Sequence, residues 1–269
     1  MFGASRGSLA TLRTSLDARR AEPGFDAISG DLLAVAALLG RERSLRQALA
    51  DAGQPGAART GIVSSLFGSQ ISEPALAVLG EVVSSRWSSD SDLVDAIERL
   101  GAQAAFTTAD ADGSLDRVEN ELFTFGRAVD DSAELAMALT NPALSTEKKA
   151  GVVRDLVGGS ASPVTVALLT HTAANLRGRR PASAVEELAR LASEQRHQVL
   201  AEVRSAIPLT LEQHTRLTSA LTSLQGRQVR LNVLVAPEVV GGIVVRVGND
   251  VIDGSVASRL EQARRALSA

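Results

Sequence analysis

The chain has 269 residues, of which 45% are hydrophobic and 22% charged, so it can bury a sizeable core and should fold as a globular protein. Its formal net charge of -3 argues against a nucleic-acid binder, which usually carries a basic excess. The lack of cysteine excludes disulfides, thiolate zinc sites and cysteine nucleophiles.

Helical spacing of apolar residues dominates about the first two hundred positions. A stripe at Leu9, Leu12 and Leu16 predicts a short N-terminal helix. Helical spacing resumes over residues 32–49, and a further apolar stripe recurs every three or four residues along 118–129. This part of the chain is therefore predicted to be an all-helical bundle.

Serine and proline residues indicate where some of these helices begin. The serine-rich segment 84–91 predicts a turn between helices, with Ser91 or Asp92 as the next N-cap. Pro181 suits the first turn of a long helix, which is predicted to run through Val199.

Parts of the helical region recur at an offset of about 90 residues. The matched positions are Leu45, Leu49, Arg59, Gly61-Ile62-Val63 and Leu66-Phe67-Gly68 in the first copy, and Leu135, Leu139, Lys149, Gly151-Val152-Val153 and Leu156-Val157-Gly158 in the second. The register slips by one residue at Pro74 against Pro163. The pattern predicts two related helical units in one chain.

The pattern changes after about residue 205. Ile207-Pro208 is predicted to end the long helix, and residues 210–213 match a capping box at the start of the next. That helix is predicted to bury a stripe formed by Leu217, Leu221 and Leu224.

Short strands follow this helix. Alternation over 229–235 predicts a first strand, and strands at 243–247 and 251–252 flank a turn at Gly248-Asn249-Asp250. Asp253-Gly254-Ser255 is predicted to cap a final helix. The sequence thus predicts a mainly α protein, with helical bundle units followed by a small C-terminal α+β unit.

One segment, residues 108–119, has the spacing of a calcium loop. Gly113 falls at the sharp-turn position and Glu119 at the position of the bidentate ligand. Thr108, however, stands where the first ligand is usually Asp, and polar helix–helix turns use the same residues. A turn is favoured, and no metal site is predicted.

Catalytic and phosphate-binding motifs are incomplete. Ser145-Thr146-Glu147-Lys148 fits the Ser-x-x-Lys of serine acyl-enzymes, but their companion motifs are missing, so a helix start is favoured. Gly241-Gly242 lacks the Lys and Ser/Thr of a phosphate loop and favours a tight turn. His171, His197 and His214 share no ligand spacing with nearby carboxylates. No catalytic residue, cofactor or metal ligand is predicted.

The one basic cluster, Arg177-Gly178-Arg179-Arg180, carries no interleaved aromatic residues on which bases could stack. A solvated turn is favoured there, and no nucleic-acid partner is predicted. The longest apolar run, Leu32 to Leu39, is shorter than the roughly 18 residues that a membrane helix needs. No direct membrane span is expected.

The segment 237–256, followed by Arg259-Leu260, closely resembles the signature of the ATP synthase delta subunit family, which includes the mitochondrial oligomycin-sensitivity-conferring protein. The signature positions are Gly241, Gly242, Gly248, Asp253, Gly254 and Ser255. Supporting matches lie upstream at Asn141-Pro142, Asn175-Leu176-Arg177 and Ala206-Ile207-Pro208. The resemblance spans about residues 100 to 269.

The resemblance implies three segments. Residues 1–99 form an N-terminal helical extension that holds the first repeat copy and is similar to long actinobacterial delta subunits. Residues 100–204 form a helical bundle that resembles the family's N-terminal domain. Residues 205–269 form the small αβ unit with the signature.

The resemblance also implies a function without active-site chemistry. Such a stator subunit joins the b-type peripheral stalk to the crown of the catalytic head, formed by alpha-subunit N-termini, so that rotor torque drives ATP synthesis. The bundle would bind an alpha-subunit helix and the αβ unit the b-type stalk, with one copy per complex at the cytoplasmic face of the cell membrane. The alternative is a free-standing helical adaptor or scaffold, including a calcium-binding one.

Overall fold

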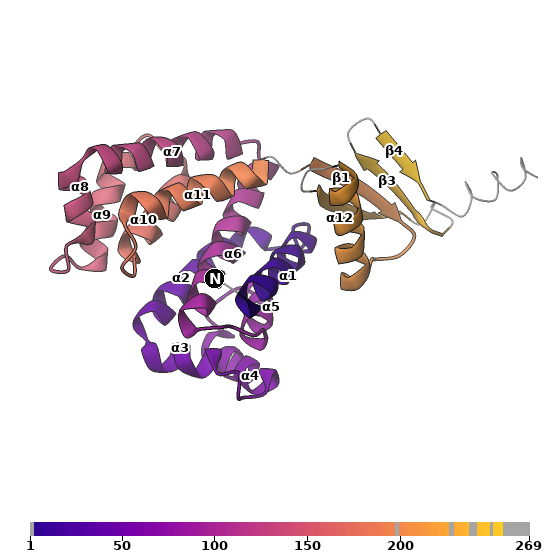
Figure 1. The fold of residues 1–269 in the computed structure, drawn as a ribbon, viewed down its shortest axis with the longest axis horizontal. Helices are drawn as coiled ribbons and strands as arrows, with labels where there is room; N and C mark the ends of the chain where they lie inside the picture. Colours follow the sequence, from indigo (N-terminus) through magenta and orange to yellow (C-terminus); the bar gives the residue numbers. More distant parts are fainter. Residues whose placement is uncertain (1–2, 197–198, 226–228, 237–240, 248–249, 255–269) are drawn as a thin grey trace, which may run out of the picture. The chain divides into compact units, whose positions relative to one another are not determined.

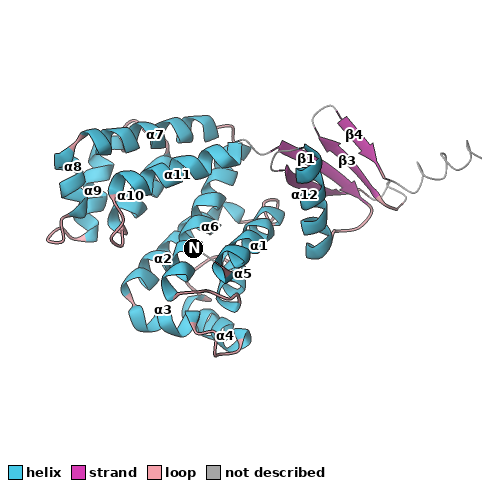
Figure 2. Ribbon diagram, viewed as in Figure 1, coloured by secondary structure: helices cyan, strands magenta, loops and turns pink. Residues whose placement is uncertain are grey.

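A computed structural model describes residues 3–196, 199–225, 229–236, 241–247 and 250–254 (Figures 1 and 2). The chain divides by its contacts into a helical unit, residues 1–16 and 20–196, and an αβ unit that contains residues 197–269. The described residues are mainly helical, with one small sheet near the C-terminus, which confirms the predicted fold class.

Eleven helices make up the described part of the helical unit. They are α1 (Ala4–Ala18), α2 (Phe25–Arg41), α3 (Arg43–Ala50), α4 (Gly56–Phe67), α5 (Glu73–Ser84), α6 (Asp90–Ala111), α7 (Leu115–Asp131), α8 (Ala133–Thr140), α9 (Thr146–Val157), α10 (Pro163–Ala174) and α11 (Pro181–Arg196). The helices α2 to α5 recur as α7 to α10 with both ends of every helix shifted by 90 residues. The predicted internal repeat is confirmed at the level of helix ends.

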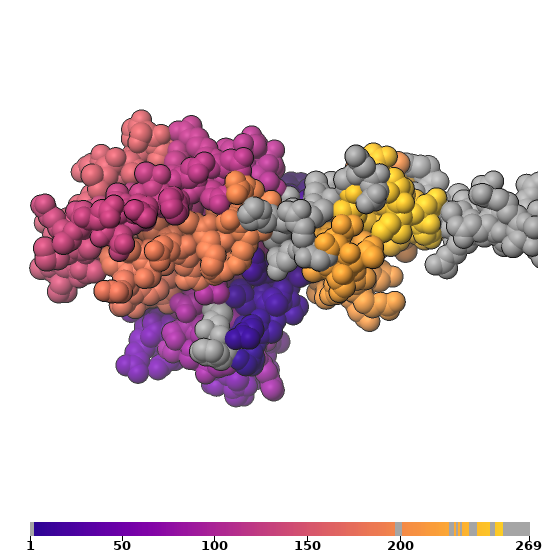
Figure 3. Space-filling view, turned by 45° about the horizontal axis from the view of Figure 1, so that its top comes forward, coloured from indigo at the N-terminus to yellow at the C-terminus, as the bar shows by residue number. Residues whose placement is uncertain are grey.

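The long helix α6 belongs to both copies of the repeat. Its first part, residues 90–105, corresponds to α11, and its residues 94–108 correspond to α1. We call α1 to α5 with residues 90–105 of α6 the first repeat, and residues 94–108 of α6 with α7 to α11 the second repeat, so that the two share most of α6. The continuous helix therefore fuses the two repeats, which lie against one another (Figures 1 and 3).

Burial along α6 follows from this double role. Leu93, Ile97 and Leu100 pack into the core of the first repeat, whereas Ala105 and Phe106 pack into the core of the second. A surface helix buries one stripe, but α6 is covered on both sides and buries most of its residues.

The predicted apolar stripes of α1 and α7 are buried. Leu9, Leu12 and Leu16 of α1 lie in the first core, and the stripe of α7 lies in the second. The helical spacing over 32–49, in contrast, is split between α2 and α3 because Glu42 leaves the helical conformation.

The predicted cap after the serine-rich turn was misplaced. Ser89 is the N-cap of α6, and its hydroxyl accepts a hydrogen bond from the Asp92 backbone N–H at 3.1 Å. Ser91 lies within the first turn, so neither it nor Asp92 caps the helix. Ser89 has the extended backbone that a cap requires.

The αβ unit contains a mixed four-stranded sheet and one described helix. Its elements are β1 (Val199–Ser205), α12 (Leu211–Gln225), β2 (Val229–Val235), β3 (Ile243–Val247) and β4 (Asp250–Asp253). The strand order is β2-β1-β3-β4. The central strand β1 pairs parallel with β2 and antiparallel with β3, and β3 pairs antiparallel with β4. The three predicted strands are confirmed.

The central strand, however, was missed by the sequence analysis. The helix predicted to run through Val199 and to end at Ile207-Pro208 ends instead at Arg196. Ala201, Val203 and Ser205 are buried at alternate positions, which is strand periodicity. Their pairing with two strands further along the chain outweighs any local helical preference.

The capping box at the start of α12 is confirmed. The Thr210 hydroxyl accepts from the Gln213 backbone N–H at 3.2 Å, and the Gln213 side chain accepts from the Thr210 N–H at 2.9 Å. Leu221 is buried as predicted, but Leu224 is 67% exposed and does not belong to the buried stripe. The predicted turn residues Gly248-Asn249 and the helix predicted after Ser255 lie outside the described residues.

Candidate functional site

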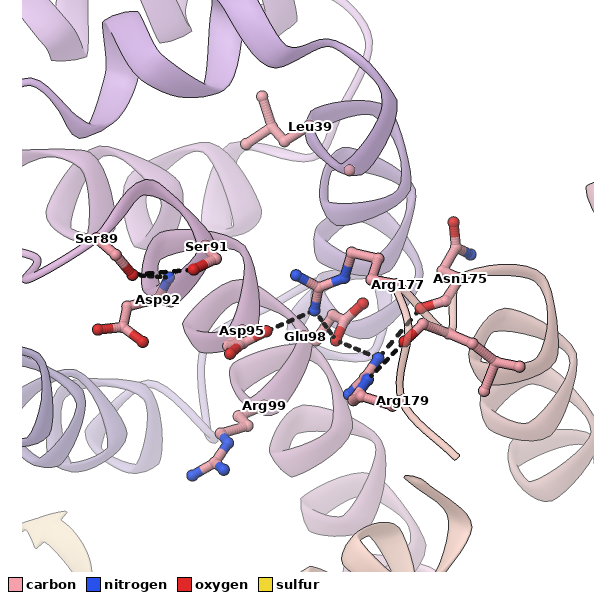
Figure 4. Close-up of polar contacts among 12 residues, drawn as sticks. Leu39, Ser89, Ser91, Asp92, Asp95, Glu98, Arg99, Asn175, Arg177 and Arg179 are labelled. Carbon is pink, nitrogen blue, oxygen red and sulfur yellow. Dashed lines mark hydrogen bonds and ion pairs between the residues drawn. The ribbon is translucent and has the colours of Figure 1, made fainter. Parts of the chain in front are cut away.

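A cluster of charged residues gathers around Glu98 of α6. The Glu98 side chain is 9% exposed, and its Oε2 accepts hydrogen bonds from Arg177 Nη2 at 2.6 Å and from Arg179 Nη2 at 3.0 Å (Figure 4). Arg177 also pairs with Asp95 Oδ1 at 2.6 Å. His171 Nε2 lies 3.4 Å from the other Glu98 oxygen. The cluster fastens α10 and the loop before α11 to the shared helix.

The loop that carries the arginines has an unusual backbone. Arg177 has a φ of 49° and Gly178 a φ of 81°, so both lie in the left-handed region. A residue with a Cβ reaches this region at some cost in energy, whereas glycine does so freely. A Cβ on Gly40, at the end of α2, would lie 3.5 Å from the Arg177 side chain. The Arg177 side chain thus packs beside α2 while its guanidinium pairs with α6.

The charges of the cluster stabilise one another. Burial by itself raises the pKa of Glu98, but the hydrogen bond from His171 and the charges of Arg179 and Arg177 together lower that pKa below its ordinary value of 4.5. Burial likewise lowers the pKa of Arg177, and the charges of Glu98 and Asp95 more than offset it and raise that pKa. Glu98 and Arg177 are therefore both charged at neutral pH.

The prediction of a solvated turn at Arg177-Gly178-Arg179-Arg180 was wrong for the side chains of Arg177 and Arg179. The Arg177 side chain is 21% exposed and the Arg179 side chain 35% exposed, and both are paired. Their carboxylate partners lie about eighty residues upstream in the sequence. Local sequence could not reveal them, because only the packing of α6 against the loop brings the charges together.

The first repeat has a neutral contact at the corresponding place. Ser8 of α1, the counterpart of Glu98, donates a hydrogen bond to the Arg86 carbonyl at 2.8 Å. Ser5, the counterpart of Asp95, accepts from the Ser88 backbone N–H at 2.8 Å. In both repeats the first helix therefore binds the loop between the fifth and sixth helices, through hydrogen bonds of Ser5 and Ser8 in the first repeat and through ion pairs of Asp95 and Glu98 in the second.

A cavity beside the cluster is small. It measures about 80 Å³ and is lined by residues of α6, α10 and α11 together with Leu33 of α2 and Arg179. Pockets for small ligands usually enclose roughly 300–1,000 Å³. The cluster therefore has the properties of a structural joint rather than of a ligand pocket.

The segment with calcium-loop spacing forms a helix–helix turn. Gly113 has a φ of 75°, and the Asp112 side chain accepts from the Ser114 backbone N–H at 2.9 Å. Thr108 donates within its own helix, and Glu119 pairs with Arg196 at 3.0 Å. The residue at the bidentate position thus already has a cationic partner.

The remaining sequence candidates also have structural contacts. Ser145 is the N-cap of α9, and its hydroxyl accepts from the Lys148 backbone N–H at 3.3 Å, as predicted for a helix start. His171 belongs to the Glu98 cluster, a role that its sequence neighbours did not indicate. His214 is buried in α12, and His197 lies outside the described residues.

The glycines of the C-terminal signature occupy special backbone positions. Gly241 and Gly242 have φ values of 70° and 79°, which side chains with a Cβ rarely adopt. The Gly254 N–H donates to the Ile243 carbonyl at 3.0 Å, and a Cβ on Gly254 would lie 3.2 Å from that oxygen. Gly248 and Ser255 lie outside the described residues.

Two further features complete the signature region. Asp253 is the last residue of β4 and pairs with Val244, so it is a strand residue. A groove of about 990 Å³ lies between α12 and the sheet, and its wall includes Leu217, Ile243 and Ile252 together with the signature glycines at 241, 242 and 254. The signature therefore shapes one wall of an apolar groove.

Two fused helical bundles followed by an αβ unit define a mainly α protein whose αβ unit carries an apolar groove of the kind in which helices dock. The model of the ATP synthase delta (OSCP) subunit family matches residues 97–267. The chain belongs to this family. The resemblance noted from the signature is thereby confirmed.

Relatives with the same name match along their whole length. The ATP synthase subunit delta of Parafrankia sp. is 42% identical over 100% of both chains, and that of Streptomyces coelicolor is 44% identical over 100% of this chain and 98% of its own. The subunit of Nocardia farcinica is 41% identical over 100% of both. The N-terminal extension is thus shared with these actinobacterial relatives.

Solved structures of related sequence include a subunit of a mitochondrial ATP synthase. A chain of the Toxoplasma gondii mitochondrial ATP synthase hexamer is 31% identical and aligns over 62% of this chain and 95% of its own, with a TM-score of 0.27. The family assignment therefore rests on sequence. No helix in the described ranges is both long and apolar enough to cross a membrane.

Proposed function

We propose that the chain is the stator subunit of a rotary F-type ATP synthase that joins the b-type peripheral stalk to the crown of the catalytic head. The observation that carries this proposal is the family match, together with relatives named as the delta subunit along the full chain. The head must be held still for rotor torque to drive ATP synthesis. The chain itself needs no catalytic residue for that task.

The helical unit suits a part that bears torque. The two repeats share the single helix α6, and the Glu98 cluster fastens the second repeat to it. Segments that open or move locally have few buried apolar contacts. Because α6 is buried on both sides, we expect it to resist such motion. These features support a stiff joint. By family resemblance, we propose that it is present once per complex, at the cytoplasmic face of the cell membrane.

Each of the three segments would have a separate role. Residues 1–99 extend the bundle, residues 100–204 bind an alpha-subunit N-terminal helix, and residues 205–269 bind the b-type stalk. The apolar groove between α12 and the sheet supports the last assignment, because helices dock in such grooves. Since β1 begins at Val199 and pairs within the sheet, a cut between the two functions belongs after Arg196.

A truncation after Arg196 tests this division. The truncated chain should still co-purify with the α3β3 head and should no longer co-purify with the b-type stalk. Circular dichroism would first establish that its helical content persists. Retention of the stalk together with loss of the head would reverse the assignment, and loss of neither would refute it.

The signature positions are proposed to act through architecture. In the full-length chain, Gly242→Val forces a β-branched residue to a positive φ and should loosen the αβ unit. Proton-driven ATP synthesis in membranes should then fall, while hydrolysis by detached heads persists. An equal loss of hydrolysis by detached heads would contradict the stator role.

A further inference from the structure

The last turn of α11 carries three consecutive side chains, at 194–196, that contact three different helices. Glu194 lies beside Arg13 of α1, with Oε2 and Nη1 3.9 Å apart. Gln195 is 3% exposed, and its Nε2 donates a hydrogen bond to Thr107 Oγ1 of α6 at 3.3 Å. These two contacts tie the end of α11 to α1 and to α6.

The third contact is to α7. Arg196 pairs with Glu119, with Nε and Oε2 3.0 Å apart, and with Asp116, with Nη1 and Oδ1 3.5 Å apart. The Glu119 side chain is 19% exposed, and salt screens partly buried ion pairs less than exposed ones. The end of α11 is thus held by α1, α6 and α7, and we call these contacts the α11 clamp.

The contact from α1 is made by a side chain that is itself fixed on α6. Arg13 Nε donates to Gln103 Oε1 at 2.9 Å, and Gln103 Nε2 donates back to the Arg13 carbonyl at 3.2 Å. Gln103 is 4% exposed. Beside this pair, Leu9, Phe106 and Leu191 line one cavity of about 20 Å³. The helices α1, α6 and α11 therefore also meet through apolar side chains.

The acidic member of the clamp is not explained by its own helix. Glu194 stands in the last turn of α11, where a negative charge opposes the helix dipole. It also pairs with Arg190 one turn earlier, but in the less favourable order, since the acidic residue follows the basic one. Its position is better explained by Arg13, which reaches it from another helix.

In the first repeat, the helix continues at the corresponding place. Residues 194–196 of α11 correspond to residues 103–105 of α6, which runs on into the second repeat. A continuous helix keeps its backbone hydrogen bonds, whereas a helix end leaves carbonyls to be paired and frays. Residues 197 and 198 separate the end of α11 from β1, the first strand of the αβ unit. Force that passes along the chain between the two units therefore enters the helical unit at the end of α11.

We propose that the α11 clamp anchors this connection, so that load from the αβ unit spreads over three helices instead of unwinding the last turn of α11. One of the three contacts comes from α1, within residues 1–99, which gives the N-terminal extension a mechanical task as a strap on α11. That the load is the torque on a stator rests on the proposed function. The clamp itself is a property of the isolated chain.

Hydrogen exchange of the full-length chain tests the clamp. Arg13→Met and Arg196→Met each remove one contact and keep a long unbranched side chain, and Arg127→Met, at an exposed position of α7, is the matched control. Backbone amides in the last turn of α11 should exchange roughly three- to tenfold faster in both clamp variants, with exchange in α4 unchanged. Exchange at the end of α11 that is as slow in both clamp variants as in the control would overturn the clamp.

Membranes that carry the ATP synthase test the load. With Arg13→Met, proton-driven ATP synthesis should fall while the amount of chain bound to the enzyme stays at the wild-type level. Unchanged synthesis together with faster exchange at the end of α11 would overturn the load-bearing role. A wild-type chain that is absent from the purified enzyme would overturn the proposed function, and the exchange result for the isolated chain would still decide whether the clamp exists.

Discussion

Four helices of the first repeat, α2 to α5, have the same ends as α7 to α10 of the second, but the two repeats differ in how each closes on its first helix. In the first repeat, Ser5 and Ser8 of α1 make neutral hydrogen bonds to the loop before α6. In the second, Asp95 and Glu98 of α6 make ion pairs to the loop before α11. The first helix of the second repeat is also the last helix of the first. The stronger contact therefore stands where one helix must hold two bundles.

Other contacts did not diverge. The Asp31 carboxylate accepts from the Ser72 backbone N–H at 2.8 Å, and the counterpart Glu121 accepts from the Ser162 N–H at 2.9 Å. Both serines also cap the helix that follows them. Contacts that satisfy helix ends are thus kept in both copies, because every helix start leaves backbone donors to be paired. The contacts that join the first helix of each repeat to the loop between its fifth and sixth helices, in contrast, differ between the copies.

The largest loss of stability is expected from removing Glu98, the carboxylate that Arg177 and Arg179 share. Glu98→Ala leaves two arginines without their shared partner and should lower the free energy of unfolding by about 3 kcal/mol. Ser8→Ala, its counterpart, should cost about 0.5–1 kcal/mol. Urea unfolding of the two variants measures both values, and equal losses would show that the two contacts are energetically alike.

A smaller effect is expected where glycines let helices approach. A Cβ on Gly101 of α6 would lie 3.1 Å from the Leu33 side chain and 3.4 Å from the Ser29 carbonyl, whereas one on Gly126 of α7 would lie 3.4 Å from Val185. Gly101→Ala should therefore destabilise the protein by about 1 kcal/mol through overpacking.

Gly126→Ala serves as the matched comparison. It should be neutral or stabilising, because alanine favours a helix over glycine by roughly 0.5–1 kcal/mol. Thermal melts should give a lower melting temperature for Gly101→Ala than for Gly126→Ala. A lower melting temperature for Gly126→Ala would contradict the idea that α6 is the more tightly packed helix.

The smallest effect is a dependence on pH. The pKa of Glu98 is lowered in the folded protein, so its stabilising contribution is fully present above its ordinary value of 4.5 and is lost as the pH falls through the lower, folded value. The difference in the free energy of unfolding between the wild type and Glu98→Gln, which we call the stability gap, should therefore shrink below about pH 4.5. The gap for Ser8→Ala should not change with pH. Denaturant titrations at several pH values test this, and a gap for Glu98→Gln that is constant with pH would refute it.

The sequence predicted elements best where the signal was local. The α12 capping box, the Ser145 cap and the stripe of Leu9, Leu12 and Leu16 each depend on residues within one or two turns. The repeat was also visible, since copies of a fold keep similar residues at one offset. The strand β1 was missed because its partners, β2 and β3, come later in the chain.

The family signature, the repeat and the succession of helices were determined by the sequence alone, because apolar periodicity and glycine positions act over a few residues at a time. Only the tertiary structure decided that α6 serves both repeats and that Glu98 pairs with Arg177 and Arg179. The physical reason is the same in each case, since burial and charge pairing depend on which distant segments pack together, and local sequence carries no record of that.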